Sequence, residues 1–358
     1  MNRFLAVLIL VTLPFTVHAK DLSDGLLVLK SETWKLLKEQ RSFSLDEKIS
    51  FTLYYRGDYK NGERKGGRVA VGYLAPRKKA LLSPGAAFNL GVNAPEIELF
   101  KGILTRNKRP GYSVAASLLN NTFQVNFNDE RNVYSATIDL NQHKSNGRYR
   151  AEIKKVQPFI KIDGDEIIPT FPAEAEDDTG DSPSTLSAEG QISTYTIEVS
   201  TVTDPEFVNI KGSSSLANST ILSVINTAET IYNNQASITF SVVNQVVTDS
   251  TVFTTNDPTT LLTQLTNYGN NVDTSSRDIG HLFTGRNLTG TTIGLAFLGV
   301  VCKSPTFSYG LTQMRNNESL AGLTFAHEVG HNLGASHDSS TNSLMSPTIN
   351  PALNTFSS

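Results

Sequence analysis

Residues 327–338 constrain this chain more than any other part of its sequence. They read His-Glu-Val-Gly-His-Asn-Leu-Gly-Ala-Ser-His-Asp and hold three of the chain's six histidines. His327 and His331 are four residues apart, so a helix places both imidazoles on one face, about one turn from each other. Gly334 can take the left-handed conformation that ends a helix, which lets the chain bring His337 back to the same point. The pattern predicts a helix, a sharp turn and a three-histidine metal site.

This ligand set is typical of a catalytic zinc ion. Three neutral imidazoles leave the fourth position of a tetrahedral ion open, whereas structural sites use four protein ligands. A Zn²⁺ ion held in this way lowers the pKa of its bound water to about 7. Glu328 can then act as general base, taking the proton and passing it to the leaving amine. We expect one zinc ion per chain and hydrolysis of peptide bonds in protein or peptide substrates.

The histidine motif and the run Ser343-Leu344-Met345-Ser346-Pro347 together resemble the zinc site and Met-turn of the metzincin peptidases. Asp338, which follows the third histidine, is similar to the adamalysin (reprolysin) branch. The resemblance extends upstream through residues 278–285, residues 290–296 and Cys302, and covers about residues 191–350. A serralysin-like peptidase is disfavoured because no glycine/aspartate calcium repeats follow the motif. An ordinary amphipathic helix with exposed histidines would leave their clustering unexplained.

The resemblance implies the fold and several site roles. It implies an α/β (α+β) metzincin-like catalytic domain with a mixed sheet and an active-site helix. Met345 is expected to pack under the metal as an apolar floor, and Asp338 to brace the turn. The strand that contains Gly294, Leu295 and Ala296 is expected to offer an edge that pairs with an extended substrate. His281 resembles a core strand position, so a hydrogen-bonded core histidine is expected there.

The first nineteen residues have the pattern of a secretory signal peptide. Arg3 gives the positive start, residues 4–17 form an interrupted apolar run, and Val17-His18-Ala19 fits a cleavage site. The run is too short for a comfortable membrane span, and no later stretch is long and apolar enough. We expect an exported protein without a stable membrane span.

Cys302 is the only cysteine, so no disulfide can form within the chain. The resembled family's animal members are rich in disulfides, which favours a bacterial extracellular or periplasmic protein. Two alternatives stay open for Cys302. It is a small apolar core residue, or it pairs with a cysteine beyond residue 358 in a chain that lacks the family's C-terminal helix.

Charge divides the chain into two unlike parts. Residues 20–168 have a net charge of +8 and residues 191–358 a net charge of −6. Between them, residues 169–190 contain six acidic residues, no basic ones and several Pro and Gly, which predicts an exposed linker. Opposite charges favour docking of the N-terminal domain on the catalytic domain. Nothing resembles the clustered arginines and interleaved aromatics of nucleic-acid binding.

We refer to residues 20–168 as the N-terminal half and to residues 191–358 as the C-terminal half. The N-terminal half is expected to be mainly β and, by its position relative to the resembled family, propeptide-like. Alternating or β-branched residues predict strands at 49–55, 68–73, 111–118, 123–127 and 133–138, with a short helix at 32–41. The C-terminal half is expected to have strands at 195–201, 238–247, 278–284 and 293–301, and helices at 215–233, 258–268 and 319–333. Asp257 is expected to cap the second helix, with Pro258 at its first position.

Two functions remain open from the sequence alone. The first is a secreted zinc endopeptidase made as a zymogen. The second is a zinc-binding adhesion protein with a vestigial catalytic domain, which the intact Glu328 disfavours. Latency cannot use a propeptide thiol, because residues 20–190 contain no cysteine. A linker carboxylate could reach the zinc instead, or the linker is simply solvated; the candidate carboxylates are Glu174, Glu176, Asp177, Asp178 and Asp181.

Overall fold

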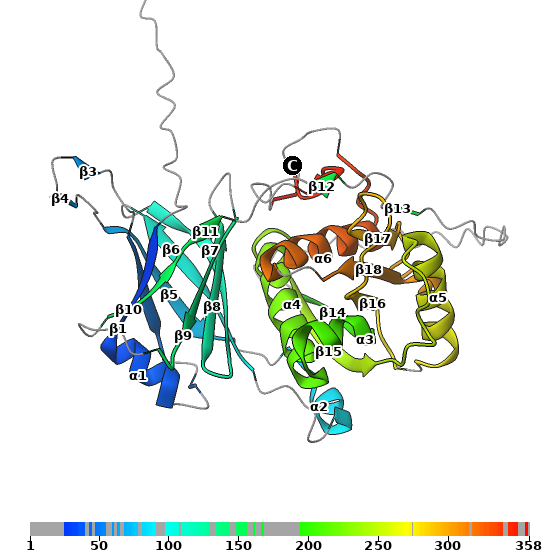
Figure 1. Cartoon of the computed structure of the whole chain (residues 1–358). Helices are drawn as coiled ribbons and strands as arrows, with labels where there is room; N and C mark the ends of the chain where they lie inside the picture. Colours follow the sequence, from blue (N-terminus) through cyan, green and yellow to red (C-terminus); the bar gives the residue numbers. More distant parts are fainter. Residues whose placement is uncertain are drawn as a thin grey trace, which may run out of the picture.

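Two sheets organise the chain, one in each half (Figure 1). This computed structural model describes residues 25–39, 43–44, 47–54, 59–60, 63–64, 68–77, 81–90, 97–106, 109–128, 133–142, 148–155, 160–161, 166–167, 194–273, 275–314, 317–338, 343–349 and 355–356. The expected signal peptide and acidic linker lie outside these residues. Among the described residues, no helix is long and apolar enough to cross a membrane.

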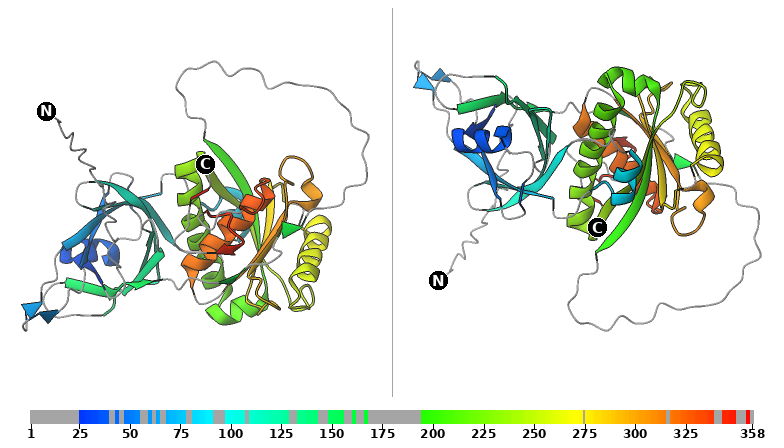
Figure 2. Two further views of the ribbon diagram at one scale, coloured as in Figure 1. Left: turned by 90° about the horizontal axis from the view of Figure 1, so that it is seen from above. Right: turned by 90° about the horizontal axis from the view of Figure 1, so that it is seen from below.

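The N-terminal half forms an antiparallel sheet in the order β10-β1-β2-β5-β6-β7-β8-β9-β11. Its strands are β1 (Leu26–Lys30), β2 (Ile49–Tyr54), β5 (Arg68–Pro76), β6 (Glu98–Arg106), β7 (Arg109–Leu119), β8 (Thr122–Asn128), β9 (Val133–Asp139), β10 (Arg148–Glu152) and β11 (Lys154–Lys155); β3 (Tyr59–Lys60) and β4 (Glu63–Arg64) form a separate hairpin. Alternate residues of β2 are buried, as its sequence predicts. The sheet curls around its apolar face, and helix α1 (Ser31–Glu39) covers one end (Figure 2). Trp34 of α1 is buried there and donates to the carbonyl of Leu140 at 3.1 Å.

The C-terminal half contains a mixed sheet in the order β13-β17-β18-β16-β14-β15. Its elements are β14 (Tyr195–Thr203), α3 (Pro205–Lys211), α4 (Ser214–Ala236), β15 (Ile238–Val247), α5 (Pro258–Asn271), β16 (Ile279–Thr284), β17 (Gly294–Phe297), the 3₁₀ turn η2 (Pro305–Phe307), β18 (Tyr309–Gln313), α6 (Glu318–Asn332) and β19 (Thr348–Ile349). Helices α4 and α6 cover one face and α5 covers the other (Figures 1 and 2). This is a mixed α/β architecture with a mixed sheet, as expected from the sequence.

Short segments of the N-terminal half lie along strands of the C-terminal half. Strand β12 (Ile160–Lys161) pairs with β19, and β13 (Glu166–Ile167) pairs with β17. Helix α2 (Pro84–Leu90) follows a short segment that touches β15. The mixed sheet of the C-terminal half therefore has N-terminal residues at both of its edges.

Helix α4 is buried on two sides. Its apolar side, which includes Ile221 and Ile225, enters the core of the C-terminal half. Its polar side faces β6, β7 and β8, where Asn226 donates to the carbonyl of Phe100 at 3.2 Å. Figure 1 shows α4 beside the N-terminal sheet.

Side-chain caps explain where the helices of the C-terminal half begin. Asp257 accepts from the backbone N–H of Thr260 at 2.8 Å, which confirms the predicted cap of α5. Asn317 caps α6 in the same way by accepting from Leu320 at 3.0 Å. Helices α3 and α4 begin at caps of the same kind.

The strand expected at 293–301 is shorter than predicted. Strand β17 ends at Phe297, because positive φ values of 67° at Gly299 and 63° at Cys302 turn the chain away from the sheet. Cys302 consequently lies in an exposed turn. The expectation that it is a small core residue is wrong.

Candidate metal centre

Helix α6 places the first two histidines and Glu328 in the interior of the C-terminal half. His327, Glu328 and His331 are all 0% exposed. The end of the helix is fastened to the sheet by Asn332, whose amide donates to the carbonyls of Phe297 at 2.9 Å and Tyr309 at 3.0 Å. These two bonds fix the orientation of the last turn of α6 relative to β17 and β18.

The turn after α6 returns the third histidine to the first two. Gly334 has a φ of +102°, in the left-handed region expected for a residue that ends a helix. One ligand nitrogen from each of His327, His331 and His337 lies within 4.8 Å of the others. The three imidazoles predicted to share one ion are therefore side by side, and this group of nitrogen donors fits a Zn²⁺ ion.

Two backbone carbonyls determine which nitrogens can face an ion. The Nδ1 atoms of His327 and His331 lie 2.6 Å from the carbonyl of Leu344 and 2.8 Å from that of Ala335. A carbonyl only accepts, so each Nδ1 carries the proton in a neutral ring and each Nε2 presents a lone pair. The two Nε2 atoms lie 3.0 Å apart. Two lone pairs at that separation require a proton or a cation between them, which supports the fit to a metal.

The Met-turn lies directly beneath α6. The amide of Asp338 donates to the carbonyl of Met345 at 2.8 Å, which ties the chain after the third histidine to the turn. Met345 is 3% exposed. A Cβ atom at Gly330 would lie 2.5 Å from its sulfur, so only glycine allows this close approach of turn and helix.

Glu328 lies against β17. A Cβ atom at Gly294 would be 2.1 Å from Oε1 of Glu328 and 2.7 Å from the methyl group of Thr324. The absence of a side chain at position 294 therefore provides the space that the carboxylate occupies. Burial, followed by the nearby charge of Glu328, raises the pKa of Tyr232 well above its usual value. Tyr232 is thus a neutral donor, and it bonds to the carbonyl of Ala326 at 2.7 Å.

His281 lies in the core, behind α6. It is 0% exposed, its Nε2 is 2.9 Å from the hydroxyl of Thr312, and its ring contacts Phe325 of α6 edge to face. Burial lowers the pKa of His281 to about 3, so the ring is neutral at physiological pH. Nδ1 of His281 has no hydrogen-bond partner among the described residues. His281 is therefore a core residue, as expected, and it is hydrogen-bonded through one of its two ring nitrogens.

The strand expected to bind substrate is already paired on both sides. Strand β17 pairs antiparallel with β18 and parallel with β13, in the register Glu166↔Ala296 and Ile167↔Phe297. The amide of Leu298 also donates to the carbonyl of Ile167 at 2.8 Å. The chain's own residues 166–167 therefore occupy part of the expected substrate edge, at Ala296 and Phe297, while no described residue pairs with Gly294 or Leu295 on that side.

Sequence reasoning missed three residues that shape this site, namely Gly330, Asn332 and Tyr232. Gly330 and Asn332 lie inside the quoted motif, but their roles depend on Met345 and on the carbonyls of β17 and β18. Tyr232 lies on α4, a helix predicted only as amphipathic. A buried hydroxyl on an apolar helix face was the one signal that could have indicated it.

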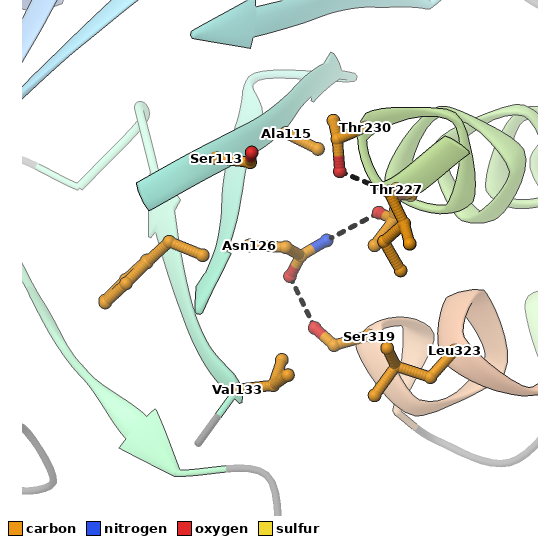
Figure 3. Close-up of a pocket in the computed structure, with 10 residues that line it drawn as sticks. Ser113, Ala115, Asn126, Val133, Thr227, Thr230, Ser319 and Leu323 are labelled. Atoms are coloured by element: carbon orange, nitrogen blue, oxygen red, sulfur yellow. Dashed lines mark hydrogen bonds between the residues drawn. The ribbon is translucent and has the colours of Figure 1, made fainter. Parts of the chain in front are cut away.

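A small cavity lies elsewhere, between the two halves (Figure 3). It is about 30 Å³ in volume and lies between β7, β8, α4 and α6. Asn126 bridges it, donating to Thr227 at 3.4 Å and accepting from Ser319 at 2.6 Å. This volume suits a water molecule rather than a substrate, so the cavity is a packing feature of the contact between the halves.

Comparison with known proteins bears on the C-terminal half. Residues 193–357 match the family model Reprolysin_5, described as metallo-peptidase family M12. A metalloproteinase-II from Bacteroides fragilis aligns at 14% identity over 87% of this chain and 89% of that chain, with a TM-score of 0.47. A structure described as a chaperone-substrate complex aligns at 22% identity over 46% of this chain and 29% of that chain, with a TM-score of 0.38. This chain thus spans less than a third of the latter protein's length.

Proposed function

We propose that this chain, whose residues 193–357 match a reprolysin-type model of metallo-peptidase family M12, is a secreted zinc-dependent endopeptidase made as a zymogen. The observation that carries the proposal is the juxtaposition of His327, His331 and His337 beside the buried carboxylate of Glu328. Three nitrogen ligands with an adjacent carboxylate are the combination required for hydrolysis by an activated water.

The chain's residues have distinct roles in this mechanism. His327, His331 and His337 would hold the ion, and the carbonyls of Leu344 and Ala335 keep the first two rings in the required tautomer. The zinc, when bound, supplies a Lewis acid that polarises a carbonyl and lowers the pKa of a water to about 7.

Glu328 is proposed as the general base. It takes the proton of the attacking water and delivers it to the leaving amine. The backbone of β17 is proposed to align an extended substrate by strand pairing, and Met345 and Asp338 to support the third ligand from below.

Latency in the intact chain is proposed to come from occupation of the β17 edge. Residues 166–167 use the backbone groups that a substrate would need, and residues 160–161 pair with β19 just beyond the Met-turn. The N-terminal half is proposed to act as a propeptide docked on α4, and cleavage within residues 169–190 to release it. This form of latency needs no cysteine.

The test compares zinc content and casein hydrolysis before and after cleavage in residues 169–190. We expect one zinc per chain and hydrolysis that increases on cleavage. The Glu328→Ala chain should keep its zinc and lose hydrolysis by several orders of magnitude. The His337→Ala chain should lose both. Zinc binding without hydrolysis in the cleaved wild type would instead favour a vestigial, zinc-binding adhesion protein.

A further inference from the structure

The sheet edge farthest from the metal is covered by residues 81–83 of the N-terminal half. The amide of Val242 in β15 donates to the carbonyl of Leu81 at 2.7 Å, and the amide of Ser83 donates back to the carbonyl of Val242 at 2.8 Å. Leu82 and Val242 form a parallel bridge. Leu81 is 2% exposed and belongs to the same apolar cluster as Phe240 and Val242. The segment thus adds one short strand to the sheet and one side chain to its core.

A buried carboxylate on α4 binds Arg77, which lies four residues before Leu81. The side chain of Glu229 on α4 is 2% exposed and forms ion pairs with Arg77 and Lys101. Arg77 donates to Glu229 through Nε at 3.1 Å and to the carbonyl of Phe240 in β15 at 3.1 Å. The amide of Phe240 donates to Glu229 at 2.7 Å. We call Glu229 together with the outer edge of residues 240–242 the β15 edge site.

Both cations at Glu229 come from the N-terminal half. The C-terminal half has five basic residues in total. Among its described residues, the ion pairs are made elsewhere: Lys211 pairs with Glu318, Arg277 with Asp273, and Arg286 with Glu206. A C-terminal half without its N-terminal half would therefore expose an open strand edge next to a carboxylate that has lost two cations. Glu229 would then keep the hydrogen bond from the amide of Phe240 but have no cation beside it, so the vacated site would favour a cationic ligand.

We propose that the β15 edge site is a second peptide-binding site of the peptidase domain, distinct from the β17 edge beside the metal. In the intact chain it holds Arg77 and residues 81–83. Once vacated, it takes an extended segment of a protein substrate that carries an arginine four residues before a leucine. Main-chain pairing with Val242 gives affinity, and Glu229 with the apolar cluster gives selectivity. This inference rests on the proposed function, because it takes the ligand of the vacated site to be a substrate of the proposed peptidase.

The test measures binding rather than hydrolysis, so its failure does not depend on the proposed activity. The whole chain is used, in a Glu328→Ala background that leaves the probe uncut. The triple change Arg77→Ser, Leu81→Ser and Lys101→Ser vacates the site by removing both cations at Glu229 and the apolar anchor, while the β12–β19 and β13–β17 pairings remain. The probe is a fluorescent peptide of residues 74–90, followed by fluorescence anisotropy.

We expect the vacated chain to bind the probe on the order of tenfold more tightly than the intact chain, in which the site is filled. Adding Glu229→Gln to the vacated chain should remove this gain. Glu198→Gln, which changes an exposed carboxylate on neighbouring β14, should leave it unchanged. Equal binding by the intact and vacated chains, or binding that survives Glu229→Gln, would overturn the proposal.

A second measurement covers the case in which the vacated chain does not fold. In the otherwise intact Glu229→Gln chain, hydrogen exchange at the amide of Val242 should be about tenfold faster than in the wild type, because the segment that protects it opens more often. The amide of Leu282 in central strand β16 serves as the control and should not change. Unaltered exchange at Val242 would show that Glu229 does not hold the segment, and would sink the proposal.

Discussion

At the scale of single residues, two glycines shape the site because they have no side chain. Gly330 leaves room for the sulfur of Met345, and Gly294 leaves room for the carboxylate of Glu328. The first glycine determines how close the Met-turn comes to α6. The second determines where the proposed general base can lie, so it tests the geometry of the site without touching a metal ligand.

We expect Gly294→Ala to lower kcat by about 100-fold, because a displacement of the base by about 1 Å costs on that order. Zinc content should stay near one ion per chain, since no ligand changes. Steady-state kinetics and metal analysis on the cleaved protein check this. Gly290→Ala, an exposed glycine of the same half where a new Cβ meets no atom within 4 Å, is the control. An unchanged kcat in Gly294→Ala would show that Gly294 does not position Glu328.

His281 gives a pH prediction. Its pKa falls from 6.5 to about 3 on burial, so the unfolded chain binds the extra proton first as pH falls. The stability associated with neutral His281 is therefore fully present above pH 6.5 and is lost progressively as pH falls from 6.5 towards 3. The contribution to the slope approaches about 1.4 kcal/mol per pH unit.

We expect His281→Leu to have a shallower loss of unfolding free energy between pH 6.5 and 4 than the wild type. Denaturant unfolding at several pH values measures this difference in slope. The variant's lower stability at pH 7 is a separate packing effect and does not enter the comparison. Parallel slopes in the two proteins would show that His281 is not the group responsible.

At the scale of elements, the sequence predicted elements with local signals better than elements that depend on partners far away in the chain. Strand β15 was predicted with its observed bounds, 238–247, and α6 to within a residue at each end, because periodicity and caps are local signals. Several strands were not predicted, among them β1, β10, β6 and β18. In β6, Lys101 interrupts the apolar pattern, and its partner Glu229 lies on α4 in the other half. In β18, Gly310 lies against His281 of the neighbouring strand, a contact that the local sequence does not reveal.

The candidate site was more predictable than the sheet around it. The three histidines were placed together from spacing alone, because a helix and one left-handed residue determine their positions. The occupation of β17 by residues 166–167 could not be predicted, since it joins segments more than a hundred residues apart in the chain. No periodicity in a two-residue strand can report such a pairing.

The β13–β17 pairing gives a prediction at this scale. Ile167→Asp should weaken β13, because Ile167 is a partly buried side chain packed on the cluster that contains Leu295 and Phe297. We expect the uncut variant to hydrolyse casein several-fold faster than the uncut wild type, since the β17 edge opens more often. Ile103→Asp, at a side chain that is 51% exposed on β6, is the control. No gain in Ile167→Asp would argue against latency by edge occupation.

At the scale of the whole molecule, the described parts of the two halves meet through polar groups, the ion pairs of Glu229 with Arg77 and Lys101, and apolar side chains. The opposite net charges, +8 and −6, should steer the halves together, while apolar side chains such as Leu81 supply much of the affinity. After cleavage in residues 169–190, we expect the halves to stay associated at low salt and to separate more readily at high salt. Size-exclusion chromatography at two ionic strengths measures this. If the stability of the complex did not change with salt, apolar burial alone would hold the two halves together.

The covered sheet edges also have a consequence for the order in which the chain folds. The described pairings of the N-terminal sheet lie within residues 26–155, so that sheet can form before the strands of the C-terminal half leave the ribosome. The later sheet would then assemble against a finished surface that supplies a strand at each of its two margins. An unpaired strand margin is where copies of a β protein join into aggregates. The N-terminal half would thus protect the C-terminal half while its long-range strand pairs close, when the protein is most exposed to self-association.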